Sequence, residues 1–142
     1  MNLTLESAQS IISDAFAAGA QHGFKPLTVV VLDAGGHVIA AARQDGASNN
    51  RFEIAQGKAY GALALGMGSR AIMERAEQQA YFIAAVTAAV GGRLIPVPGG
   101  VLVRGQDGTV LGAVGITGDT SDNDETAATT AIEAAGLTAQ AA

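Results

Sequence analysis

Apolar residues recur at every third or fourth position in several stretches of the chain, which is the spacing of one helix face. The first stretch follows Thr4, a favourable N-cap with Glu6 in the next turn, and it ends before Gly23. The last stretch follows Ser121, which we expect to cap a helix that ends near Gly136. Both patterns predict amphipathic helices that bury one face.

The middle of the chain predicts three further helices. Residues 51–65 carry an apolar stripe that surrounds Lys58. Ser69 is expected to cap a short helix that runs to Glu77, and a third helix covers residues 79–90 before two glycines.

Four short segments rich in valine, isoleucine and leucine predict strands rather than helices. They are residues 28–32, 37–42, 101–104 and 109–116. Asp33 with the glycines that follow it suits a turn between the first two, and an Asp-Gly pair suits a turn between the last two. We therefore expect two β-hairpins.

The remaining segments are predicted to be irregular. Pro96 and Pro98 exclude a helix or a central strand over residues 94–100. The tail, residues 138–142, is expected to be frayed. The predicted order is a helix, two strands, several helices, two strands and a helix. It lacks the regular strand–helix alternation that produces a parallel sheet, so we expect one α+β domain over residues 1–142.

The composition predicts self-association. Hydrophobic residues make up 49% of the 142 residues, and charged residues only 15%, against roughly 25% in an average soluble protein. This is more apolar surface than a monomer easily buries, so we expect a homo-oligomer, from a dimer up to an octamer.

The charge balance and the missing cysteines exclude several classes of function. The net charge is −5 without a basic cluster, so we expect no nucleic-acid partner and no membrane partner. The amino terminus lacks the basic start of a signal peptide, and no apolar run is long enough to cross a bilayer, so a cytoplasmic location is expected. Without cysteine, thiolate chemistry and cysteine-ligated metal sites are excluded.

Glycine is frequent, with 19 residues, and most of the pairs suit turns or helix ends. The segment Pro98-Gly99-Gly100 is different, because a stiff proline followed by two residues without a Cβ could present main-chain amides to an anion. Neither a phosphate-binding loop nor a dinucleotide fingerprint occurs.

Lys58 and Asp33 are ionisable residues whose roles can each be interpreted in two ways. Lys58, among small apolar neighbours, either extends to water or supplies a charge or a base to a carboxylate ligand. Asp33 is expected to form the turn, with an ion pair to Lys58 or Arg43 as the alternative.

His22 and His37 are the candidate axial ligands if the protein binds haem, which needs only one protein side chain on the iron. Tyrosine and methionine are weaker candidates, at Tyr60, Tyr81, Met67 and Met73. No metal site is predicted, because the two histidines are not at ligand-pair spacing. The acidic residues between Asp119 and Glu125 are assigned to helix capping.

Several motifs together are similar to one known family. They are Leu3-Thr4-Leu5 with Ala8, residues 30–37, Lys58-Ala59, residues 96–101, residues 112–118 and Asp124-Glu125. In this order and spacing, over about residues 3–136, they resemble the GlcG/HbpS-like family, also called haem-degrading domains and related to the PduO carboxy-terminal domain.

The resemblance implies a profilin- or PAS-like fold, with an antiparallel sheet and assembly into homo-oligomers. Some members bind haem, and one is an extracellular redox-sensing accessory protein. By resemblance, the ligand pocket would include Asp33, Lys58 and the segment from Pro98 to Gly100. Residues 49–57 depart from the aliphatic stretch usual before the shared lysine, which leaves the ligand open.

We therefore expect a protein that binds haem, another tetrapyrrole or a small ligand. The alternative is a small enzyme or enzyme subunit acting on a carboxylate or enol-type metabolite, in which Lys58 is the charge or base and the Gly99 and Gly100 amides stabilise an oxyanion. A third reading is an oligomeric scaffold without a ligand.

Overall fold

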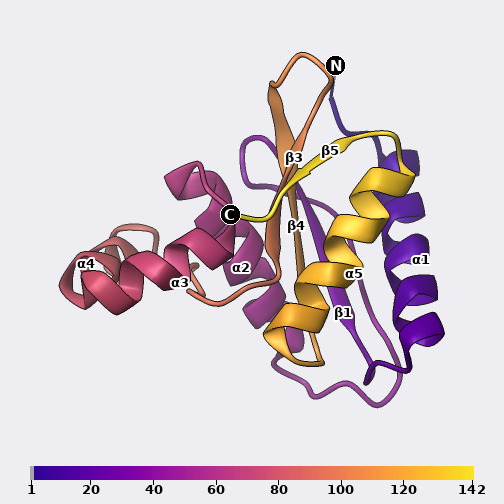
Figure 1. The fold of residues 1–142 in the computed structure, drawn as a ribbon, viewed down its shortest axis with the longest axis horizontal. Coiled ribbons are helices and arrows are strands. Elements are labelled where there is room, and N and C mark those ends of the chain that lie inside the picture. The colour runs from indigo at the N-terminus through magenta and orange to yellow at the C-terminus, as the bar shows by residue number, and fades with distance from the viewer. Residues whose placement is uncertain (1) are drawn as a thin grey trace.

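A five-stranded antiparallel sheet forms the centre of the molecule in the computed structural model, which describes residues 2–142 (Figure 1). Its strand order is β2-β1-β4-β3-β5. The strands are β1 (Thr28–Asp33), β2 (Val38–Arg43), β3 (Gly100–Arg104), β4 (Val110–Thr117) and β5 (Thr138–Gln140). The two predicted hairpins are confirmed as β1-β2 and β3-β4, and β1 pairs with β4 between them.

Residues 2–142 also form five helices, which together with the sheet confirm the α+β class. They are α1 (Leu5–His22), α2 (Arg51–Leu65), α3 (Ser69–Gln78), α4 (Ala80–Ala89) and α5 (Ser121–Ala134). Helices α1 and α5 cover one face of the sheet, α2 covers the other, and α3 with α4 extends away from it (Figure 1).

The side-chain alternation of β1 divides the core into two layers. Val29 and Val31 pack in the cluster that includes α1 and α5. Val30 and Leu32 pack against α2. All four are fully buried, as expected for a central strand that is covered on both faces.

The predicted N-caps are right at α1 and wrong at two other helices. Thr4 caps α1 through a capping box, as expected. Thr120, rather than Ser121, caps α5. Gly68 precedes α3, so that Ser69 is the first helical residue and its hydroxyl contacts another part of the chain.

The expectation of a frayed tail is also wrong. Residues 138–140 form the edge strand β5, which pairs with β3. The Arg104 guanidinium donates to Oε1 of Gln140 at 2.6 Å, and a Cβ on Gly68 would lie 2.0 Å from the main chain of Ala141. Pairing with β3 and the close approach to Gly68 thus order a segment that has no strong pattern of its own.

Two further properties hold for the described part of the chain. None of its helices has the length and hydropathy needed to cross a bilayer. Within residues 2–142, no group of three or more histidine, aspartate or glutamate side chains is arranged to hold a metal ion.

Candidate functional site

Lys58 lies on the face of α2 that packs on the sheet, and its side chain is only 2% exposed. Its ammonium donates to the carbonyl oxygen of Ile116 at 2.9 Å and to Oδ2 of Asp124 at 3.1 Å. Oδ1 of Asp124 accepts from the Asp119 amide at 2.9 Å. The expectation that Lys58 extends to water is therefore wrong, because its charge is satisfied inside the protein.

Burial perturbs both partners of this ion pair. It lowers the pKa of the Lys58 ammonium, and the neighbouring Asp124 carboxylate opposes the change. Burial likewise raises the pKa of Asp124, and the Lys58 ammonium opposes that change. Each group stabilises the charged form of the other, so the pair links α2, β4 and α5 as one unit.

The segment Pro98-Gly99-Gly100 is buried and passes directly against α2. A Cβ on Gly100 would lie 2.2 Å from the carbonyl oxygen of Lys58, and a Cβ on Gly99 would lie 2.8 Å from the ammonium. The Gly100 amide donates to the hydroxyl of Ser69 at 2.7 Å. Here the missing side chains allow close approach of a helix, and the amide of Gly100 is already bound within the protein.

The structure brings Lys58, Gly99 and Gly100 together but does not bring Asp33 to them. Asp33 ends β1, opposite Gly112, whereas Lys58 binds near the other end of β4. Oδ1 of Asp33 accepts from the amides of Gly35 at 2.9 Å and His37 at 3.0 Å, which confirms the turn interpretation. The His37 amide makes the largest contribution to the lowered pKa of Asp33.

The acidic residues at the start of α5 have a role beyond capping. Asp122 forms an ion pair with Arg70 of α3, and Oε2 of Glu125 lies 3.0 Å from Nε of the same arginine. These contacts raise the pKa of Arg70. They connect α3 to α5.

The two candidate axial histidines lie at different ends of β1. His37 is exposed in the β1-β2 turn, with Nδ1 3.4 Å from Oδ1 of Asp33. His22 is the last residue of α1 and stacks on Phe24, with ring centroids 5.3 Å apart and an interplanar angle of 21°.

Phe24 lines an open pocket of about 570 Å³, which we call the His22 pocket after the histidine stacked on that ring. Its walls come from the end of α1, the loop after it and the end of β2. The lining residues are Gly19, Ala20, Phe24, Pro26, Arg43, Gln44 and Asp45. The pocket thus combines small residues, an aromatic ring, a guanidinium and the Asp45 carboxylate, and the exposed His22 imidazole stacks on its aromatic ring.

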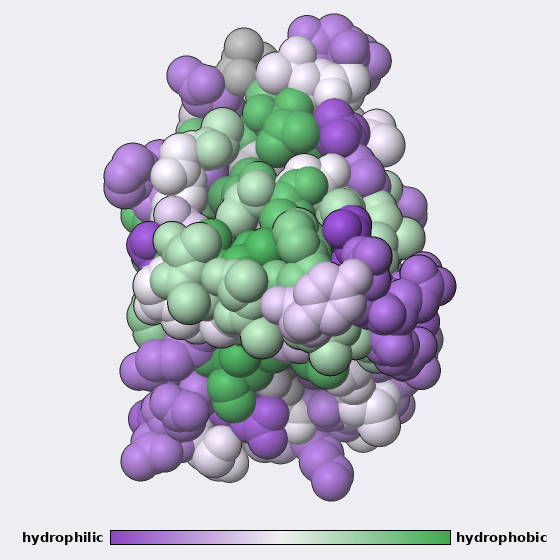
Figure 2. All heavy atoms as spheres, turned by 90° about the vertical axis from the view of Figure 1, so that its left-hand side faces the viewer, coloured by the Kyte–Doolittle hydropathy of each residue, from purple (hydrophilic) through white to green (hydrophobic). Residues whose placement is uncertain are grey.

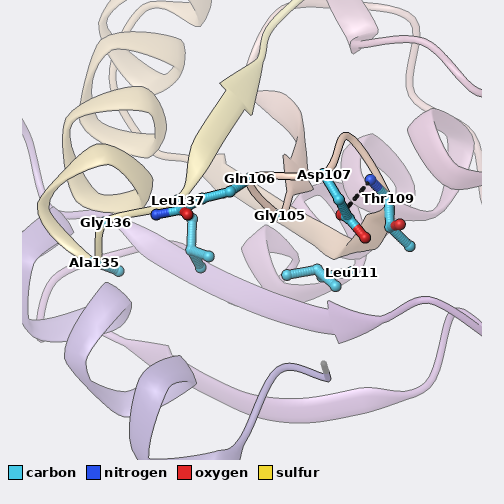
Figure 3. A pocket seen from close by; sticks show the side chains of 8 residues that line it. All are labelled: Gly105, Gln106, Asp107, Thr109, Leu111, Ala135, Gly136 and Leu137. Carbon is cyan, nitrogen blue, oxygen red and sulfur yellow. Dashed lines mark hydrogen bonds between the residues drawn. The ribbon is translucent and has the colours of Figure 1, made fainter.

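A second pocket, of about 490 Å³, lies between the β3-β4 turn and the segment after α5 (Figure 3). Leu111 and Leu137 line it from two sides, and Asp107 accepts a hydrogen bond from the Thr109 amide at 3.0 Å (Figure 3). It contains neither an imidazole nor a cationic side chain among its lining residues.

The sequence did not predict Asp124 as the partner of Lys58, Ser69 as the partner of Gly100, or Arg43 as a pocket residue. Asp124 could have been found, because it lies three and four residues before Ala127 and Ala128 on the buried stripe of α5. The contact between Ser69 and Gly100 joins residues 31 positions apart and leaves no local signal.

Comparisons with known proteins agree with this architecture. A family model described as haem degrading protein HbpS-like matches residues 3–133. An uncharacterized 15.0 kDa protein from the dhaT-dhaS intergenic region of Citrobacter freundii is 30% identical, with 92% of this chain and 90% of the relative covered.

Three solved structures are similar over nearly their full length. The PduOC:heme complex has a TM-score of 0.85 and 23% identity, covering 96% of this chain and 97% of the other. Protein ORFY of Klebsiella pneumoniae has a TM-score of 0.85 and 25% identity, with coverage of 94% and 90%. HbpS has a TM-score of 0.80 and 26% identity, again with coverage of 94% and 90%.

Proposed function

Because the chain belongs to the HbpS-like family, we propose that it binds haem or a related tetrapyrrole, with His22 as the axial ligand. The single observation that carries this proposal is the stacking of the exposed His22 imidazole on Phe24, whose ring lines an open cavity of about 570 Å³. The solved PduOC:heme complex, which has the same fold, supports this class of ligand.

The residues of the His22 pocket fit a flat, largely apolar ring that carries carboxylates. Ala20 presents only a methyl group to the pocket, and Phe24 offers an aromatic surface. Arg43 supplies a positive charge suited to a propionate. His37 fits less well, since the pocket beside its turn has no cationic side chain among its lining residues, whereas the His22 pocket has Arg43 besides the Asp45 carboxylate.

Bound haem would supply an iron centre whose reactivity depends on its axial ligand and on the polarity around it. The role of the chain in this proposal is to bind and orient the ring. Lys58 takes no part in it, because its ammonium is held by Ile116 and Asp124 away from the pocket.

The test is titration of the purified protein with haemin, followed by the Soret absorbance. We expect a saturable shift in the wild type and in His37→Ala, and loss of that shift or a clearly different spectrum in His22→Ala. Both histidines are exposed, so both variants should fold normally. A wild type that gives no shift would refute haem binding, and an unaltered His22→Ala would refute the ligand assignment.

We also propose that the chain forms homo-oligomers through α4. This helix carries no charged residue, only Ile83 is buried among its ten residues, and Tyr81 is 73% exposed. Figure 2 shows a band of hydrophobic surface on the side of the molecule where α3 and α4 extend, with hydrophilic residues around it. Contiguous apolar surface of this kind favours contact with a second copy of the chain.

A further inference from the structure

Thr28 presents a buried hydroxyl that has no partner. The residue is 1% exposed, and its Oγ1 makes no hydrogen bond within residues 2–142. Buried hydroxyls are nearly always paired, because an unpaired one loses its hydrogen bonds to water on folding. Threonine is retained here in a strand that otherwise consists mainly of valine and leucine, which would fill the position without this loss.

Thr28 also lines a small open pocket of about 180 Å³ at the end of the sheet, on the side of α2. The other lining residues are Ala41, Ala42, Arg43 and Phe52. Along β1, Thr28 lies on the same face as Val30 and Leu32, which pack against α2, so its side chain is on the same side as Phe52. We call this cavity the Thr28 pocket.

The Thr28 pocket is flanked by positive charge. Arg43 is exposed at its rim, directly across the β1-β2 ladder from Thr28. Arg51 is nearby: its Nη1 donates at 2.9 Å to the hydroxyl of Thr117, the β4 partner of Thr28. Neither arginine forms an ion pair with an acidic residue in the described part of the chain.

We propose that the Thr28 pocket binds a short-chain monocarboxylate. A guanidinium beside a hydroxyl can bind the two oxygens of a carboxylate, and Phe52 with the alanines would contact a short aliphatic chain. The apolar walls favour a carboxylate with a hydrocarbon tail over inorganic phosphate. The volume suits an anion of about four carbons and excludes a tetrapyrrole.

Oγ1 of Thr28 is covered in the structure, and Phe52, at the start of α2, is a partly buried wall of the same pocket. The proposal therefore includes a side-chain movement that opens the hydroxyl to the ligand. This proposal does not depend on haem binding, although Arg43 also lines the His22 pocket.

The test is calorimetric titration of the full chain with butyrate at neutral pH, with butyramide as the uncharged isostere and inorganic phosphate as the second anion. We expect butyrate to bind in the millimolar range, with butyramide and phosphate at least about tenfold weaker. Thr28→Val and Arg43→Gln should each weaken butyrate binding by about fivefold or more.

The variants separate a binding effect from misfolding. Thr28→Val keeps the β-branched shape and removes only the unpaired hydroxyl, so its melting temperature should not fall. Arg93→Gln removes a positive charge beside Tyr60, away from the pocket, and should bind butyrate like the wild type. His22→Ala should also bind it normally, whatever its effect on haemin.

Three outcomes would overturn the proposal. They are the absence of butyrate binding to the wild type, equal binding of butyramide, and unchanged affinity in both Thr28→Val and Arg43→Gln. Tighter binding of phosphate than of butyrate would also contradict it, because the apolar walls would then have no role in recognition.

Discussion

The ion pair between Lys58 and Asp124 is the most deeply buried pair of charges in residues 2–142, with exposed side-chain fractions of 2% and 1%. Such a pair contributes little net stability compared with apolar residues of the same size, but the loss of one partner is severe. The alternative in which Lys58 acts on a substrate would need this pair to open, so the geometry favours a structural role.

The first prediction concerns this pair. Lys58→Met or Asp124→Leu should each lower the free energy of unfolding by about 3–5 kcal/mol, because each leaves an uncompensated buried charge. The double variant should recover a large part of the loss. Urea unfolding of all four proteins measures the coupling, and additive effects would contradict the structural assignment.

The second prediction concerns pH and Asp119. Its carboxylate accepts from the Lys25 amide, the Asn123 side chain and the Thr120 amide, which lower its pKa from the ordinary 3.8. The folded pKa lies below the unfolded one, so this stabilisation is present above about pH 4 and is lost as the pH falls through the folded pKa.

Wild type should therefore be more stable than Asp119→Asn at pH 7, by less than about 1 kcal/mol because water screens this carboxylate, and the difference in stability should narrow towards pH 3. Chemical unfolding at the two pH values provides the measurement. A difference that stays constant, or grows on acidification, would show that the ionised carboxylate is not what stabilises the loop.

Individual site residues were only partly predictable from the sequence. Lys58 and Asp124 each lie on an apolar helical stripe, so the burial of both could be inferred from spacing. Their partnership could not, because it depends on which helices meet across the sheet edge. The unpaired hydroxyl of Thr28 has no sequence signal either, since threonine is an ordinary strand residue.

At the scale of elements, α2 lies unusually close to the sheet. A Cβ on Gly115 would be 1.9 Å from the carbonyl oxygen of Ala55, and one on Gly100 would be 2.2 Å from that of Lys58. Gly100 and Gly115 are paired in the β3-β4 ladder. The helix backbone therefore rests directly on two adjacent strands at positions where only glycine fits.

The third prediction compares glycines at this contact with a glycine in a turn. Gly100→Ala and Gly115→Ala should each destabilise the fold by roughly 3 kcal/mol or more, because main-chain atoms must move. Gly91→Ala should cost only about 1 kcal/mol, since Gly91 has φ 68° and nothing within 4 Å of an added Cβ. Thermal unfolding measures the difference. Equal losses at all three positions would contradict the close approach of α2.

Most elements were predictable because their patterns are local. Residues 51–65 were predicted as a helix with the bounds that α2 has, and the Asp-Gly turn marked the second hairpin. The exceptions depend on partners distant in sequence. β5 is ordered by pairing with β3, and the hydroxyl of Ser69 binds Gly100 instead of capping its own helix.

In the whole molecule, one surface in particular lacks charged residues. Helix α4 extends from the body of the fold, and it has no charge among its ten residues. The composition predicted more apolar surface than a monomer buries. It could not predict where that surface lies, because this depends on how α3 and α4 extend from the sheet (Figure 1).

The fourth prediction is that Ala84→Glu dissociates the oligomer. Light scattering should give the wild type a mass of at least twice 14.1 kDa, and the variant a mass near 14.1 kDa, because a charge would be buried in the interface. Ala17→Glu, on the exposed side of α1, is the matched control and should keep the wild-type mass. A monomeric wild type, or an unaffected Ala84→Glu, would contradict the assignment of α4.

Family membership was predictable from the order of the motifs, because the same motifs form the hairpins and the contacts of α2 with the sheet. The position of the ligand pocket could not be predicted in the same way. The resemblance pointed to Lys58 and Gly99, yet in the structure these residues contact each other, and the larger pockets that we describe lie elsewhere.

A crystal structure of the protein grown with haemin would show directly whether haem binds at His22. We expect planar density in the His22 pocket, with the His22 imidazole on the iron and the Phe24 ring and Arg43 guanidinium in contact with the ligand. Haem coordinated by His37 or bound between Lys58 and Gly99 would contradict this assignment. So would a clear map with an empty His22 pocket, if the same protein shifts the Soret band in solution.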